Sequence, residues 1–207
     1  MNVEREDALF WYHKYKNSDG RTLEDSDEFG EENLIMELTK AKGIADGLVD
    51  RLAPYCERIE VAGSVRRERP SVGDIEIVCI PKMVEVPDTF FDTKIEKHAG
   101  FIEAVDSFEK LKGDARDGKY MQRFIKEYNI KLDIFTATRT NWGLIFAIRT
   151  GSAEFSHRVL ATGWKKKGFT SINGNLRNDL GRVPVYEEID LFKLIGIEWV
   201  PPKEREL

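Results

Sequence analysis

The sequence predicts an α+β fold, in which a mixed or antiparallel sheet with flanking helices precedes a small C-terminal subdomain. Two patterns favour this fold. Alternating apolar and polar runs, typical of strands, concentrate between residues 58 and 137, and apolar residues at helical spacing occur before and after them. With 207 residues, 41% of them apolar, the chain can bury a core in one domain or two small lobes.

The first 30 residues predict an acidic segment and linker. Residues 1–35 hold ten acids against four bases, although the whole chain carries a net charge of only -5. Residues 2–16 are compatible with a short helix, and residues 17–30 are polar and rich in Gly and Asp. From Glu31 to Leu52, apolar side chains recur every three to four residues, which predicts one or two amphipathic helices interrupted near Gly43 and Gly47.

The central segment predicts the sheet. Strands are expected over residues 58–62, 74–80 and 130–137, and a hairpin over 106–111 and 120–128. A helix over residues 94–104 is expected to separate the second strand from this hairpin.

After Thr140 the pattern becomes helical. Helices are expected over residues 141–149, 153–167 and 187–195, with Gly168 as a C-cap, short strands near 169–176 and a stop at Pro201–Pro202. We therefore expect three parts, over residues 1–30, 31–140 and 141–207. Residues 139–182 hold eight bases against two acids, which suits contact with nucleic-acid phosphates but also an ordinary solvated surface.

Several classes of protein are disfavoured. No apolar run approaches the roughly 20 residues of a membrane span, and the N-terminus is too charged for a secretory signal, so we expect no membrane partner and a cytoplasmic protein, or one of the host cytoplasm if viral. Cys56 and Cys79 are isolated, which indicates core thiols. His13, His98 and His157 show no metal-ligand spacing.

The most informative stretch is VAGSVRRERPSVGDIEIVCIP, residues 61–81. Gly63–Ser64 follows a strand and precedes two arginines, which is a plausible triphosphate cradle, although such a dipeptide is more often an ordinary turn. Asp74 and Glu76 lie on one face of the next strand, and Asp133 lies on a later strand. Adjacent carboxylates repel, so this pattern favours a compensating Mg²⁺ and two-metal phosphoryl transfer.

At these residues the sequence resembles family X DNA polymerases, the DNA polymerase beta-like nucleotidyltransferases. Their palm carries a Gly-Ser turn with following arginines, an Asp-x-Asp strand and a third Asp. The resemblance extends from about Leu34 to Arg205 and includes the Thr150–Gly151–Ser152 hinge, the 165–170 and 187–192 segments and the ending at 199–205. It implies a minimal palm over 31–140 and a thumb over 141–207.

The resemblance also implies roles. Asp74, Glu76 and Asp133 would be catalytic and would bind two Mg²⁺ ions, with Mn²⁺ as a substitute. The positions implied for nucleoside triphosphate binding are Gly63, Ser64, Arg67, Gly73, Thr150, Gly151 and Ser152. The positions implied for primer or DNA contact are Lys131, Arg149, Ser156 and Arg158. The implied reaction adds a (deoxy)nucleoside monophosphate to a nucleic-acid 3' hydroxyl, on a primer-template or gapped DNA.

The sequence departs from the family's pattern at three places, one of which is a pair of residues. Glu76 replaces the second Asp, Ile148–Arg149 replaces an aromatic pair before the hinge, and Ser156 replaces a common asparagine. The length leaves no room for the family's N-terminal DNA-binding domain, so we expect no deoxyribose-phosphate lyase activity and weak, salt-sensitive DNA binding. Two alternatives stay open: nucleotidyl transfer to a protein or small molecule, and an inactive nucleic-acid-binding module. The sequence leaves the oligomeric state undetermined.

Overall fold

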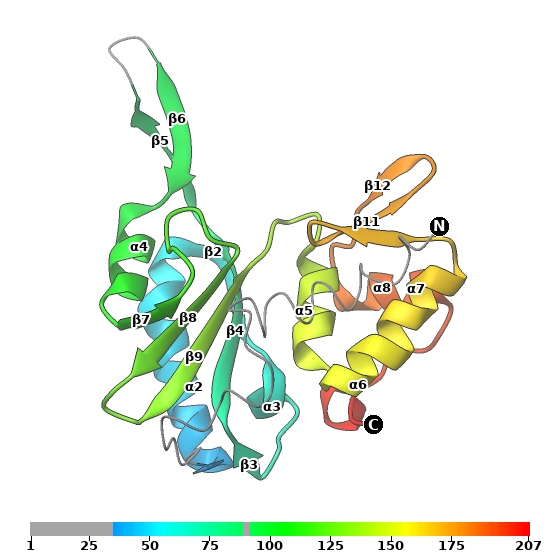
Figure 1. Cartoon of the computed structure of the whole chain (residues 1–207), viewed down its shortest axis with the longest axis horizontal. Helices are drawn as coiled ribbons and strands as arrows, with labels where there is room; N and C mark the ends of the chain where they lie inside the picture. The colour runs from blue at the N-terminus through cyan, green and yellow to red at the C-terminus, as the bar shows by residue number, and fades with distance from the viewer. Residues whose placement is uncertain (1–34, 89–91) are drawn as a thin grey trace, which may run out of the picture.

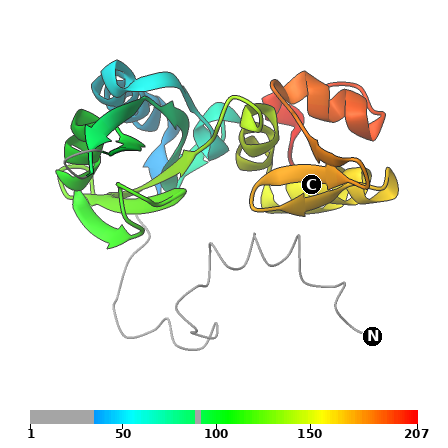
Figure 2. The same cartoon turned by 90° about the horizontal axis from the view of Figure 1, so that it is seen from above.

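The computed structural model describes residues 35–88 and 92–207. The acidic segment and the helix expected over residues 2–16 lie outside the described residues. Two lobes stand side by side, an N-terminal lobe of residues 35–140 and a C-terminal lobe of residues 141–207 (Figures 1 and 2). The predicted α+β class is confirmed.

A five-stranded mixed sheet forms the N-terminal lobe. Its order is β2 (Cys56–Val61), β4 (Asp74–Pro81), β9 (Ile130–Thr136), β8 (Tyr120–Ile125) and β7 (Glu109–Lys112). The neighbours β4 and β9 are parallel, and the other pairs are antiparallel. The predicted strands and the β7–β8 hairpin are therefore present, and the parallel pair makes the sheet mixed.

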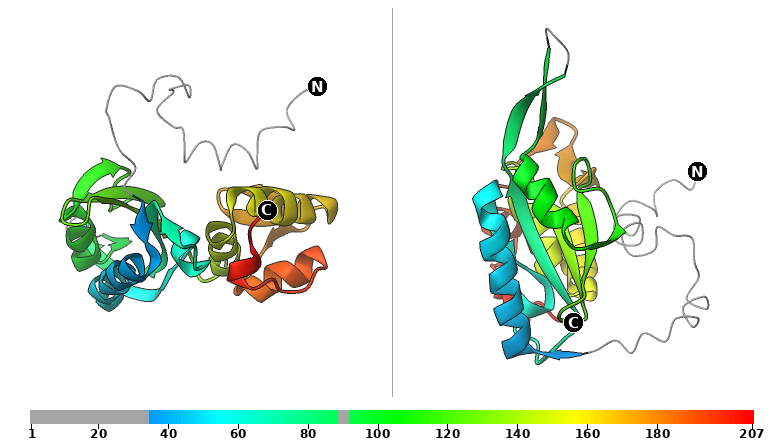
Figure 3. Two further views of the ribbon diagram at one scale, coloured as in Figure 1. Left: turned by 90° about the horizontal axis from the view of Figure 1, so that it is seen from below. Right: turned by 90° about the vertical axis from the view of Figure 1, so that its left-hand side faces the viewer.

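One face of this sheet is covered by helices α2 (Leu38–Leu52) and α4 (Ala99–Asp106). The view at the right of Figure 3 shows both helices on the same side of the strands. Alternation along β4 and β9 sends Ile75, Ile77, Leu132 and Ile134 into this core, where all four are fully buried. Helix α2 runs unbroken past both glycines, so the expected interruption is absent.

Short elements complete the lobe. Strand β1 (Met36–Glu37) pairs with β3 (Ser71–Val72), the 3₁₀ turn η1 (Ala53–Tyr55) leads into β2, and helix α3 (Gly63–Arg66) follows β2. Both cysteines are buried thiols outside any disulfide, as predicted.

The prediction of a helix over residues 94–104 was wrong for the first half of that range. Residues Thr93–Lys97 form β6, which pairs with β5 (Met83–Pro87) in a hairpin that projects from the lobe (Figures 1 and 3). The helical period starts only at Ala99, after His98, whose Nδ1 accepts a hydrogen bond from the Gly100 amide at 3.0 Å. Pairing with a distant segment overrode the local helical spacing.

The C-terminal lobe combines helices with a small three-stranded sheet. Helix α5 (Trp142–Thr150) is followed by a continuous helical stretch composed of α6 (Ala153–Phe155), the π-helical turn η2 (Ser156–Ala161) and α7 (Thr162–Lys166). Strands β10 (Thr170–Ile172), β11 (Asn175–Asn178) and β12 (Gly181–Val183) precede α8 (Glu188–Ile195) and the 3₁₀ turn η3 (Pro202–Glu204). The predicted helices are thus present, and Gly168 ends α7 with a φ of 80°.

Helix α5 joins the two lobes. Trp142 and Phe146 pack on Val78 and Phe135 of the sheet face opposite α2, whereas the Leu144 side of the helix belongs to the core of the C-terminal lobe. In the described part of the chain, no helix has both the length and the apolar character needed to cross a bilayer.

Candidate active site between the lobes

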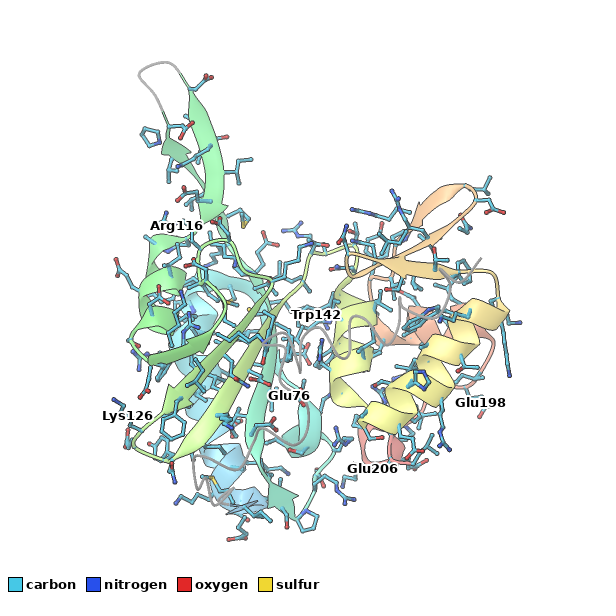
Figure 4. All side chains as sticks on the ribbon, viewed as in Figure 1. Glu76, Arg116, Lys126, Trp142, Glu198 and Glu206 are labelled. Carbon is cyan, nitrogen blue, oxygen red and sulfur yellow. The ribbon has the colours of Figure 1, made fainter. Side chains whose placement is uncertain are left out.

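Three carboxylates lie on the sheet face that looks toward the C-terminal lobe. The parallel register sets Glu76 directly beside Asp133 and sets Asp74 beside Lys131. Val78 follows on the same face, but α5 covers it, so the carboxylates occupy the uncovered end of that face. Figure 4 shows Glu76 on this side of the N-terminal lobe.

Asp133 is the most enclosed of the three, with 5% exposure. Its Oδ1 accepts hydrogen bonds from Gln122 Nε2 at 2.9 Å and from the Tyr120 hydroxyl at 3.2 Å. Burial and the negative charge of Asp74 raise the pKa of Asp133 to about 6, although the two hydrogen bonds act in the opposite direction. Repulsion between the carboxylates is therefore built into this face.

The Gly63–Ser64 turn lies against the same carboxylates. Gly63 has a φ of 60°, and a Cβ at this position would collide with Glu76 Oε2. The turn therefore requires glycine for its conformation and for the space that Glu76 occupies. The Ser64 hydroxyl is buried and has no hydrogen-bond partner among the described residues, which suits an anionic ligand that brings acceptor oxygens.

The donor set fits a hard divalent cation. Three carboxylates supply only oxygen ligands, and a cation would relieve the repulsion that raises the pKa of Asp133. Among the described residues, however, no three acidic, histidine or cysteine side chains are gathered around one point. Binding a cation would therefore involve rotation of at least one carboxylate, and the Glu76 side chain, which lies over Gly63, is the longest of them.

The side chains of Arg66 and Arg67, which follow the Gly63–Ser64 turn, form hydrogen bonds with residues of the C-terminal lobe. Arg66 donates to both carboxylate oxygens of Glu188 at 2.8 Å and to Thr150 Oγ1 at 2.5 Å. Arg67 donates to Glu206 at 2.5 Å and to the Thr150 carbonyl at 2.8 Å. The Thr150 side chain is fully buried, and its contacts with the two arginines connect the lobes.

The hinge after Thr150 is packed closely. A Cβ on Gly151 would lie 2.7 Å from Ser156 Oγ. Ser152 Oγ accepts from the Phe155 amide at 3.0 Å and so caps α6, and Ser156 Oγ donates to the Ile148 carbonyl at 2.8 Å. Both serine hydroxyls thus shape the helical stretch that begins beside the carboxylates.

A small pocket of about 140 Å³ brings most of the predicted site together. Its lining residues are Ser64, Arg67, Asp74, Glu76, Ile148, Arg149, Gly151, Ser152, Ala153 and Ser156. Strand β4, the Gly-Ser turn and the hinge, which lie far apart in the sequence, therefore face one space. Of the residues predicted to bind the nucleotide or the metal, Gly63, Gly73, Asp133 and Thr150 do not line this pocket.

A larger cavity of about 570 Å³ adjoins the small pocket. The two share Ile148, Arg149, Ala153 and Ser156, and the cavity extends over Trp164 between the β10–β11 turn and the sheet. The predicted DNA-contact residue Arg158 also lines it, where it forms an ion pair with Glu154 at 2.7 Å. No local pattern in the sequence indicates this cavity, because its walls come from segments of both lobes.

Arg149 marks the boundary between the two spaces. Its guanidinium stacks on the Phe135 ring at 3.9 Å, and Phe135 stacks on Tyr120 at 5.0 Å. The positive charge of Arg149 lies close enough to Asp133 to lower its pKa, which offsets part of the increase caused by burial and by Asp74. Lys131, predicted as a DNA contact, lies on the same face beside Asp74.

Comparison with known families identifies the second lobe. Residues 146–206 match the family model described as DNA polymerase beta thumb. The C-terminal lobe is a DNA polymerase beta-like thumb. The match starts within α5 and runs through α8 to Glu206, so it covers the hinge, the helical stretch with the π turn and the acids that bind Arg66 and Arg67. No curated protein matches the chain.

Proposed function

We propose that the chain is a nucleotidyltransferase that adds a nucleoside monophosphate from a triphosphate to a nucleic-acid 3' hydroxyl, as a DNA polymerase beta-like enzyme would. The observation that carries this proposal is the small pocket, where Asp74 and Glu76, with Asp133 beside them, meet the Gly151–Ser152 hinge of a polymerase-type thumb. Neither part alone would point to nucleotide transfer, since paired carboxylates serve many reactions and a thumb lacks chemistry of its own.

In this proposal the carboxylates bind magnesium. When bound to Asp74, Glu76 and Asp133, two Mg²⁺ ions, or Mn²⁺ in their place, would lower the pKa of the attacking hydroxyl and offset the charge of the leaving pyrophosphate. Asp133, which lies beside Glu76 on the neighbouring strand, is the carboxylate that would accept the proton of the 3' hydroxyl. The 3' oxygen forms the new bond to the α-phosphorus, and the bond to the pyrophosphate oxygen breaks.

The other residues would hold the substrate. The Ser64 hydroxyl and the Arg67 guanidinium are placed to contact phosphate oxygens. The larger cavity of about 570 Å³, with Ile148, Trp164 and Ala161 among its apolar walls, would receive the nucleobase. Arg158, Arg182 and Lys119 on its lining offer positive charge to the DNA backbone.

Primer extension tests the proposal. The assay uses a labelled gapped duplex, each nucleoside triphosphate offered singly, and Mg²⁺ or Mn²⁺. The variants are Asp133→Asn and a matched control, Asp50→Asn, which changes an exposed acid on α2 behind the sheet. We expect extension by the wild type and the control, and a loss of at least a hundredfold in Asp133→Asn.

The outcomes separate the alternatives. Addition of only the complementary nucleotide means that a template is used, whereas indiscriminate addition means terminal transfer. If labelled nucleotide appears on protein and never on the primer, the acceptor is a protein and not a nucleic-acid 3' hydroxyl. Metal-independent DNA binding without nucleotide affinity would instead indicate a non-catalytic binding module, and undiminished extension by Asp133→Asn would refute the catalytic assignment.

A further inference from the structure

The last residues of the thumb return to the N-terminal lobe. Arg205 is fully buried, its Nη1 donates to Glu188 at 2.5 Å and its Nε donates to the Val200 carbonyl at 2.9 Å. The Ser152 amide donates to the Arg205 carbonyl at 2.9 Å. With residue 205 fixed in this way, the next side chain, Glu206, reaches Arg67 beside the small pocket.

Two hydrogen bonds define the orientation of Arg67. Its Nε donates to Glu206 Oε1 at 2.5 Å, and its Nη1 donates to the Thr150 carbonyl at 2.8 Å. A guanidinium carries five N–H groups, so Arg67 can also donate to a phosphate without giving up either bond. Its side chain is 12% exposed and lines the small pocket with Ser64.

We propose that Glu206 is a positioning residue for triphosphate binding, because it holds the Arg67 guanidinium at the pocket before the nucleotide arrives. This inference rests on the proposed function, since it assigns the anionic ligand of Arg67 to the triphosphate. A long arginine side chain that is already ordered loses less conformational entropy when a phosphate binds. The end of the thumb thereby contributes to nucleotide affinity without contacting the nucleotide.

Charge could argue against this role, since a carboxylate near a triphosphate repels it. The Glu206 charge is compensated, however, by Arg67 and also by Arg69, whose Nε lies 3.5 Å from Glu206 Oε1. Arg67 lines the small pocket, whereas Glu206 does not. Repulsion at the distance of the phosphates is therefore small beside the benefit of a fixed guanidinium.

The test compares Glu206→Gln and Glu206→Asp with Glu204→Gln, a matched change at an exposed acid two residues earlier. Binding of deoxyadenosine triphosphate and of inorganic tripolyphosphate is measured by calorimetry with Mg²⁺ and without primer, beside KM and kcat for primer extension. We expect Glu206→Gln to weaken both ligands by about 3- to 10-fold and to raise KM, with kcat within about twofold. Glu206→Asp, which retains the charge, should recover part of the loss.

A double variant separates positioning from general stability. If Glu206 acts through Arg67, Glu206→Gln should add little further loss in an Arg67→Lys background, because a lysine cannot make the two directed bonds. Thermal melting accompanies each measurement, and a fall in melting temperature with unchanged ligand affinity would reduce Glu206 to a structural tether. Tighter ligand binding by Glu206→Gln would mean competition with the triphosphate, and an equal loss in Glu204→Gln would mean a nonspecific charge effect; either result overturns the inference.

The failure of this inference is distinguishable from failure of the proposed function. A wild-type chain that binds neither probe would contradict the proposed function and the inference with it. A wild type that binds both probes, with a Glu206→Gln variant that binds them equally well, would leave the proposed function standing and reject only the role of Glu206.

Discussion

The Oε2 atom of Glu76 occupies the space that a Cβ on Gly63 would need. The conformation of the Gly63–Ser64 turn and the position of the Glu76 carboxylate therefore depend on each other. The Glu76 side chain is accommodated above a residue that has no side chain.

Gly63→Ala is expected to destabilise the fold and to impair activity. The left-handed φ of 60° costs an alanine roughly 1–2 kcal/mol, and the contact with Glu76 adds to this cost. Glu76→Asp shortens the opposing side chain, so the double variant should recover part of the stability, with a coupling free energy on the order of 1 kcal/mol in urea unfolding. Gly43→Ala, at an uncrowded helical position of α2, serves as the control and should be neutral or stabilising. Strictly additive effects of the two site changes would contradict the contact.

Asp133→Asn is expected to stabilise the protein while it removes activity. The ordinary pKa of an aspartate is 3.8 and that of Asp133 is about 6, so between these values the folded state binds more protons than the unfolded state. The free energy of unfolding contributed by Asp133 therefore falls as pH rises through this window, by on the order of 2–3 kcal/mol in total. Asparagine avoids this loss.

Urea unfolding with a chelator present, at pH 5 and pH 8, measures this effect. The increase in the free energy of unfolding caused by Asp133→Asn should be larger at pH 8, where the wild-type carboxylate is ionised. Asp50→Asn should show no such difference, because Asp50 is exposed on α2. A gain that is equal at both pH values would show that burial does not penalise the ionised carboxylate.

Glu188 is expected to be the strongest ionic link between the lobes. Burial by itself raises the pKa of Glu188, but hydrogen bonds and charges from Arg66 and Arg205 outweigh burial and hold its pKa below the ordinary value of 4.5. The ionised form therefore stabilises the fold above about pH 4.5, and this contribution is lost as pH falls through the lowered pKa. Glu188→Gln leaves the buried Arg205 without its counterion, for a cost of about 3–5 kcal/mol.

The adjacent residue provides a matched control. Glu187 pairs with Arg58 across the same boundary, but its side chain is 52% exposed. Glu187→Gln should therefore cost no more than about 1 kcal/mol. Urea unfolding of both variants at pH 7 measures the contrast, and similar values for the two would mean that burial does not strengthen the Glu188 link.

The sequence predicted the parts of the site that depend on local pattern. Alternation placed Asp74 and Glu76 on one face of their strand, and the parallel register of β4 and β9 sets Asp133 beside Glu76. The contacts that Arg66 and Arg67 make with the other lobe could not be predicted from the sequence, because their partners lie more than 80 residues away in the chain. Local chemistry suggested a phosphate cradle, and the fold also uses these guanidinium groups to connect the lobes.

The projecting hairpin shows the same limit in secondary structure. Residues 94–104 contain apolar side chains at helical spacing, and nothing local marks the change of period at His98. Only the antiparallel partner Met83–Pro87 makes Thr93–Lys97 a strand. The cavity of about 570 Å³ was equally beyond sequence analysis, since it exists only once α5 packs on the sheet.

Finally, Lys165, Lys166 and Lys167 are expected to bind DNA phosphates. All three are exposed at the end of α7, where they could instead only interact favourably with the helix terminus. Replacing all three with alanine should lower the affinity for a labelled gapped duplex at least tenfold at about 100 mM salt. It should also reduce the slope of log affinity against log salt by about 0.9 for each phosphate that the variant no longer neutralises.

Fluorescence anisotropy between about 50 and 200 mM salt gives both the affinity and the slope. The control is Lys110→Ala/Lys126→Ala, at exposed lysines on the far edge of the sheet, which should leave both values unchanged. An unchanged slope with a lower melting temperature in the triple variant would assign the three lysines to the helix end. The slope decides between the two roles, because a lysine that neutralises a phosphate releases a counterion, whereas a lysine that only stabilises the helix terminus does not.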